Sequence, residues 1–234
     1  MATLEVGNED SGIYNFHVHE SILCELDFFK ATLQGGFKEA STKLIKMPED
    51  DPLFMACLVE FLYHGNYQEP VSSAQKGDDK NAFMRKLFHA RVFVLGEKYT
   101  FQRLCNEAAS YMRLRRITVY PEATTADNAN LLEYVIQLYQ MSGPSSALRI
   151  PKASDTARSC PEPIVWDSKT AATWIGRMWR DVVQRPLVEE AFKRCPDLAQ
   201  DLLIMITSGF VDKLADECLR EEDPFQELGQ GIYL

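Results

Sequence analysis

The hydrophobic period of this chain changes near residue 20, and few folds accommodate such a change. Over residues 13–19, Phe16 and Val18 alternate with polar neighbours, a period of two that is typical of a β-strand with one buried face. Over residues 20–33, apolar side chains recur at spacings of three and four, which is typical of an amphipathic helix. The two periods cannot share one element, so the sequence predicts a strand followed directly by a helix.

The flanking segments extend this pattern to a small sheet with helices. Residues 3–6 read as a strand, and the Gly/Asn/Asp-rich turn at residues 7–12 predicts a hairpin with the strand at residues 13–19. Residues 44–47 read as a third strand. Asp51 followed by Pro52 is a strong helix start, so we expect a helix over residues 53–63. Three more helices are predicted, at residues 81–90, 91–99 and 102–116. This order predicts an α+β fold, a small sheet capped by helices.

The second half of the chain reads as mostly helical. Residues 142–165 carry Gly143 and four prolines, and a structureless stretch of that length is either a linker or a functional loop. We therefore expect one domain over residues 1–117 and a helical C-terminal extension over residues 118–234. The expected helices of the extension lie at residues 126–140, from 167 or 168 to about 182, 186–194, 197–207 and 210–221.

Composition limits the classes of partner. Apolar residues make up 46% of the 234 residues and charged residues 25%, the balance of an ordinary soluble domain. The net charge of −9 argues against nucleic acid and anionic membranes as partners, because both require a basic face. No apolar run reaches the ~20 residues of a membrane span, and no secretory signal is visible. The six cysteines contain no C-x-x-C pair, which favours free thiols and an intracellular location, cytoplasmic or nuclear.

The sequence contains no recognisable catalytic motif, neither a nucleophile elbow nor a phosphate-binding loop, so we predict no catalytic residues and no cofactor. His17 and His19 lie two apart on a predicted strand and could share a face, as metal ligands would. No third ligand stands near them in sequence, so a structural role is favoured and no metal site is predicted. Trp166, Trp174 and Trp179 fit core packing, although they could also line a pocket beside the long loop.

Residues 13–112 resemble the BTB/POZ domain family, specifically its compact fungal members. The resemblance rests on fragments in the family's order, each short but together spanning about a hundred residues. These fragments are Phe16 to Cys24, Phe29 to Ala31, Gly35 to Glu39, Met47 to Pro52, Phe61 to Gly65, and Val92 to Tyr99. The resemblance implies a BTB/POZ fold and a role in binding protein partners.

Two binding surfaces are expected, one from this resemblance and one from the apolar pattern of a helix. Phe37-Lys38-Glu39 aligns with the loop that family members use to grip a cullin-type ubiquitin-ligase scaffold, so Phe37 and Glu39 are candidate partner-binding residues. The alternative is that Phe37 folds back onto the sheet and Glu39 is solvated. The helix at residues 20–33 carries surplus apolar surface, which usually marks an interface. We therefore expect a homodimer built on this helix, with Leu23, Leu26, Phe28 and Phe29 at its interface.

Other functions stay open at this level. The protein could act as a scaffold or regulator that never contacts a cullin. It could also be an enzyme or small-molecule binder, for example from a fungal biosynthetic cluster, that reuses the fold with a pocket in the extension. The favoured hypothesis is an adaptor or homodimerising interaction module.

Overall fold

The computed structural model describes residues 1–10, 12–69, 79–114, 125–143, 145–146, 148–149 and 185–207. The chain divides into two compact units, residues 1–120 and residues 121–234, and each unit is considered by itself below. The domain boundary expected after residue 117 falls within residues 115–124, outside the described part of the chain.

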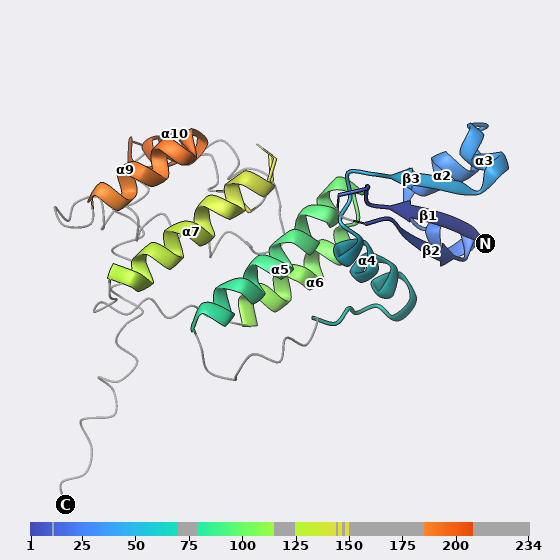
Figure 1. The fold of residues 1–234 in the computed structure, drawn as a ribbon, viewed down its shortest axis with the longest axis horizontal. Helices are drawn as coiled ribbons and strands as arrows, with labels where there is room; N and C mark the ends of the chain where they lie inside the picture. The colour runs from blue at the N-terminus through green and yellow to red at the C-terminus, as the bar shows by residue number, and fades with distance from the viewer. Residues whose placement is uncertain are drawn as a thin grey trace, which may run out of the picture. The chain divides into compact units, whose positions relative to one another are not determined.

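Within the described residues of the first unit, three strands form one sheet (Figure 1). The strands are β1 (Ala2–Val6), β2 (Tyr14–Val18) and β3 (Leu44–Met47), in the order β2-β1-β3. β1 runs antiparallel to β2 and parallel to β3. The predicted hairpin and third strand are therefore confirmed. Ala2, Leu4 and Val6 are buried while Thr3 and Glu5 are partly exposed, so only one face of the sheet lies in the core.

In the described residues, the helices of the first unit lie between β2 and β3 and after β3 along the chain. They are α1 (Glu20–Leu23), α2 (Asp27–Gln34), α3 (Lys38–Thr42), α4 (Pro52–His64), α5 (Asp79–Lys98) and α6 (Gln102–Leu114). The helix start predicted at Asp51 is confirmed, because its Oδ1 accepts a hydrogen bond of 2.8 Å from the backbone N–H of Leu53. α4 ends at Gly65, whose φ of 72° is the left-handed conformation that glycine adopts most readily. The α+β class predicted from the sequence is correct.

Two helix predictions are wrong, each for an identifiable reason. The single helix expected over residues 20–33 is interrupted, because Leu26 has an extended backbone (φ −97°, ψ 125°) and starts α2 as its N-cap. This break turns the chain so that Leu23, Leu26 and Phe29 can all enter the core, where they are 0%, 3% and 0% exposed. By contrast, the two helices expected at residues 81–90 and 91–99 form the continuous α5, because no glycine or proline separates them.

A glycine sets the distance between α5 and α6. A Cβ atom on Gly96 would lie 2.7 Å from Cys105 Sγ, much closer than normal van der Waals contact. Cys105 is buried, and its Sγ donates to the Phe93 carbonyl oxygen over 3.6 Å. Gly96 therefore permits the close approach of α5 and α6.

The second unit is helical in its described residues, with α7 (Thr125–Met141), α9 (Arg185–Arg194) and α10 (Pro196–Thr207). These three helices correspond to those predicted at residues 126–140, 186–194 and 197–207. Their packing buries Leu132, Val135, Ile136, Val188 and Leu198. The helices predicted near residues 168–182 and 210–221, most of the loop expected at residues 142–165, and the three tryptophans lie outside the described residues.

Candidate partner-binding site

A tight loop between α2 and α3 presents Phe37 to solvent. The chain leaves α2 through Gly35 and Gly36, and Gly36 adopts a left-handed φ of 74°. A Cβ atom on Gly35 would lie 2.2 Å from the Ala31 carbonyl oxygen and 3.1 Å from Phe37 Cε2, so the Phe37 ring rests directly against this glycine. Phe37 is the N-cap of α3, and 62% of its surface is exposed. It does not fold back onto the sheet.

Glu39 lies two residues further on, in the first turn of α3, and is partly exposed. Its carbonyl oxygen accepts a hydrogen bond of 2.8 Å from the Lys43 N–H, which closes α3. Lys43 itself has a φ of 56°, an uncommon left-handed conformation for a residue with a side chain. The short helix thus holds the Phe37 and Glu39 side chains on a defined backbone.

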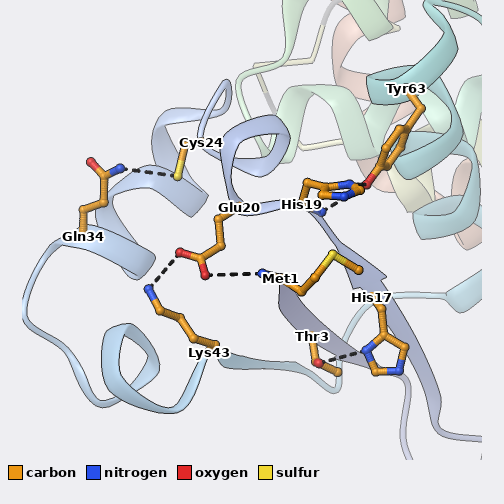
Figure 2. A network of polar contacts seen from close by, with 9 residues as sticks. All are labelled: Met1, Thr3, His17, His19, Glu20, Cys24, Gln34, Lys43 and Tyr63. Atoms are coloured by element: carbon orange, nitrogen blue, oxygen red, sulfur yellow. Dashed lines mark hydrogen bonds and ion pairs between the residues drawn. The ribbon is translucent and has the colours of Figure 1, made fainter.

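An ion pair fastens the far end of α3 to α1. Lys43 Nζ lies 2.9 Å from Glu20 Oε2, and the α-amino group of Met1 lies 3.6 Å from Glu20 Oε1 (Figure 2). The hydrogen bond from Lys43 holds the pKa of the Glu20 carboxyl below its ordinary value, and the positive charges of Lys43 and the N-terminus act in the same direction. These groups are solvent-accessible, so the pair orients the loop more than it stabilises the fold.

His19 connects α1 to the end of α4. The Tyr63 hydroxyl lies 3.0 Å from the His19 backbone N–H, which donates to it, and 2.7 Å from His19 Nδ1 (Figure 2). His17 Nδ1 lies 3.1 Å from Thr3 Oγ1. Each histidine thus has a partner within the chain, as a structural role requires. Among the residues that the structure describes, no three His, Cys, Asp or Glu side chains are close enough to hold a metal ion.

The four residues expected at a dimer interface do not lie together on the surface. Leu23, Leu26 and Phe29 are buried inside the first unit, and only Phe28 is exposed, at 47%. In this conformation the three buried side chains cannot contact a second copy. The prediction that these residues lie on the surface of one unbroken helix is therefore wrong for Leu23, Leu26 and Phe29. The turn before α2 directs all three side chains inward.

Phe28 rests on a fixed aromatic platform. Its ring makes edge-to-face contacts with Phe29 and Tyr99, at centroid distances of 5.1 Å and 5.2 Å. Phe29 and Tyr99 stack at 5.4 Å with an interplanar angle of 21°. Tyr99 also donates a hydrogen bond of 2.6 Å to Asp50 Oδ2. Burial, followed by this bond to an acidic partner, raises the pKa of the Tyr99 hydroxyl.

No protein-family model and no curated protein matches this chain. The site is therefore interpreted from its own geometry. Two side chains are exposed aromatics, Phe28 in the first turn of α2 and Phe37 three residues after its end, on a backbone that the core and the Glu20–Lys43 pair hold in place. Rigid exposed aromatics with a nearby carboxylate are suited to anchoring a protein partner.

Two of the described thiols, Cys57 and Cys105, are poorly suited to nucleophilic chemistry. Burial raises the pKa of both the Cys57 and the Cys105 thiol to about 12, so both are protonated at neutral pH. Cys24, Cys57, Cys105 and Cys195 are free cysteines.

No described helix is long and apolar enough to cross a membrane.

Sequence reasoning singled out Phe37 and Glu39 but missed the long-range contacts around them. Glu20 and Lys43 are 23 positions apart, and His19 and Tyr63 are 44 apart, so no local pattern could pair them. Opposite charge was the one available signal for the first pair. Tyr63 lies within a fragment that carried the family resemblance, but that fragment did not indicate its partner.

Proposed function

We propose that the first unit is a protein-interaction module of the BTB/POZ type, with Phe37 and Glu39 contacting a cullin-type ubiquitin-ligase scaffold. The order of its elements supports the assignment, because a strand hairpin, short helices, a third strand and further helices make the small capped sheet that the resemblance implies. The proposed activity is binding, with no chemical step.

The observation that carries this proposal is the exposure of Phe37. An aromatic ring that is 62% exposed leaves much apolar surface in water, and its burial in a partner pocket would release that water. The loop backbone is already held by α3 and by the Lys43–Glu20 pair, so little conformational entropy is lost when a partner binds. Glu39 is placed to orient a basic or hydrogen-bonding group at the rim.

The test is a pull-down with the N-terminal region of a cullin, followed by affinity measurement. Truncation of a central aromatic anchor usually reduces binding by at least ~2 kcal/mol, so Phe37→Ala should weaken the complex about thirtyfold or more. Glu39→Ala should have a smaller effect, mainly on the association rate, because rim charges act on orientation and steering.

Met84→Ala provides a matched control. Met84 is 63% exposed, so its truncation removes a similarly exposed apolar side chain from another part of the same unit. It should leave cullin binding unchanged. Failure of the wild-type chain to bind, or equal losses for Phe37→Ala and Met84→Ala, would reject the adaptor role.

Homodimerisation is a second candidate function, supported by the exposed Phe28. Because Leu23, Leu26 and Phe29 are buried, a dimer on this surface would depend on Phe28 and on polar groups of α2. Phe28→Ala should then raise the dimer dissociation constant in sedimentation measurements. The enzyme hypothesis concerns a pocket in the extension, whose candidate residues lie outside the described part of the chain.

A further inference from the structure

The hydrogen bonds between β1 and β3 fix the direction of every backbone group in the sheet. Thr3 N–H donates to the Lys43 carbonyl over 2.8 Å, and Gly7 N–H donates to the Met47 carbonyl over 3.1 Å. Alternate residues of a strand point their N–H and C=O groups to opposite sides, so Leu4 and Val6 point toward β2. In the register of the hairpin, Leu4 faces Phe16 and Val6 faces Tyr14.

This register also shows which backbone N–H and C=O groups of β2 point away from β1. Tyr14, Phe16 and Val18 exchange hydrogen bonds with β1, so the intervening residues Asn15 and His17 direct their N–H and C=O groups away from the sheet. By the same alternation, Ile13 also points outward. No backbone hydrogen bond to these outward groups occurs within the described part of the chain.

At the C-terminal end of β2, a side chain of the same chain already binds the outward backbone N–H. His19 is the next outward residue in the series, and its N–H donates to the Tyr63 hydroxyl over 3.0 Å. This bond agrees with the direction assigned to Ile13, Asn15 and His17. The open edge therefore runs from Ile13 to His17 and stops where Tyr63 covers it.

β2 lacks the devices that normally protect an edge strand. Lysine, proline and bulges discourage pairing with other strands, and the opposite edge strand, β3, contains Lys46 and is followed by Pro48. Residues 13–19 contain neither lysine nor proline, and β2 pairs with β1 without a register shift. Ile13 and Tyr14 are 53% and 56% exposed.

We propose that β2 pairs with β2 of a second copy of this chain, in antiparallel orientation, so that the two sheets become continuous. The occupant is identified by self-complementarity. Although the chain has a net charge of −9, residues 13–19 contain no Asp, Glu, Lys or Arg, so two copies bring no permanent like charges together along the strand. A symmetric dimer uses the same edge twice and leaves neither copy's edge open.

If the twofold axis of the dimer passes beside Asn15, every outward backbone N–H and C=O group of Ile13, Asn15 and His17 finds a hydrogen-bond partner on the second copy. Asn15 then faces Asn15 of the second copy as a hydrogen-bonded pair, and Ile13 faces His17. On the core face, Tyr14 faces Phe16, and cross-strand aromatic pairs are favourable. This interface is separate from Phe28 and Phe37, so it can form whether or not the proposed cullin contact exists.

Cysteine cross-linking tests the register on the full chain. The two Cα atoms of a hydrogen-bonded antiparallel pair lie about 5.5 Å apart, within the range that a disulfide spans. Asn15→Cys should therefore give an intermolecular disulfide between the two new thiols, identified by peptide mass. His17→Cys should cross-link several-fold more slowly, because the axis places it opposite Ile13. Equal rates at both positions would overturn the register.

Backbone and charge variants test the dimer itself by sedimentation up to about 100 µM, a concentration that detects weak association. Asn15→Pro removes an outward N–H that β1 does not use and fixes φ at this position, whereas Asn15→Lys leaves the backbone unconstrained and sets two positive charges across the axis. Each should raise the dimer dissociation constant at least about tenfold relative to Asn15→Ala, with an unchanged circular dichroism spectrum. A monomeric wild type overturns the proposal. The proposal is also overturned if Phe28→Ala abolishes the dimer while both Asn15 variants leave it intact.

Discussion

Tyr99 donates a hydrogen bond of 2.6 Å to Asp50 Oδ2, across 49 positions of sequence. Asp50 is only 8% exposed, and its second oxygen accepts a hydrogen bond of 2.8 Å from Lys98 Nζ. The carboxylate thus joins the segment between β3 and α4 to the end of α5. Because Tyr99 also stacks on Phe29, this buried carboxylate helps to fix α2, and through α2 the Phe28 side chain.

Removal of the Tyr99 hydroxyl should destabilise the first unit. A hydrogen bond to a charged group contributes about 1.5–3 kcal/mol, and Tyr99→Phe leaves a buried carboxylate oxygen without that donor. We expect a loss of this size in the free energy of unfolding, measured with urea. Tyr14→Phe removes a hydroxyl from a tyrosine that is 56% exposed and should change stability by less than about 0.5 kcal/mol. Equal losses in both variants would contradict the role of Asp50.

The Glu20–Lys43 pair should give a stability difference that depends on pH. Since the folded-state pKa of Glu20 is lowered, its contribution is present above the unfolded-state pKa and is lost as pH falls through the folded value. The urea midpoint of Glu20→Gln should therefore lie below that of the wild type near neutral pH, and the gap should close as the pH falls below the ordinary carboxyl range and Glu20 becomes protonated in both states. Salt should shrink the gap at neutral pH. A gap that is the same at every pH would show that the carboxylate charge is irrelevant.

Thiol labelling should follow burial. Cys57 and Cys105, each with a pKa of about 12, should react with a thiol reagent far more slowly in the native protein than after denaturation. Cys24 is only partly buried and should react before them. Peptide mapping of a labelling time course distinguishes the sites. Early labelling of Cys105 would mean that α5 and α6 separate readily in solution.

Arg149 should be a principal support of the second unit. Its Nη2 donates to the carbonyl oxygens of Tyr139 and Ser142 at 3.0 Å and 2.8 Å, where α7 ends, and its Nη1 lies 2.8 Å from Asp197 Oδ2 in α10. Lysine lacks this planar fork, so Arg149→Lys should rescue little of the damage caused by Arg149→Ala.

Hydrogen exchange resolves the effect by segment. Both Arg149 variants should lower the protection of α7 and α10 by about 2 kcal/mol or more and leave α4 unchanged. Lys193→Ala is the control, because Lys193 has an exposed side chain and its ion pair with Glu190 is long, at 3.6 Å. An equal effect of Lys193→Ala would contradict the role assigned to Arg149.

The sequence by itself determined the elements whose signals are local. The hairpin, the strand at residues 44–47 and the start of α4 depend on side-chain alternation, turn residues and the Asp51-Pro52 cap, all of which act within a few positions. Their boundaries could be predicted closely for that reason. The fragment resemblance made Phe37 a candidate anchor, and the glycines before it indicated a loop, but only the structure showed that its ring is exposed.

Only the tertiary structure decided which apolar residues face inward and which groups meet. Leu23, Leu26 and Phe29 entered the core because the chain turns between α1 and α2, which periodicity alone could not show. The parallel pairing of β1 with β3, and with it the outward direction of Asn15, depends on contacts between strands some 40 residues apart. Such pairings are set by the total free energy of packing, to which distant residues contribute, and a local pattern carries no record of them.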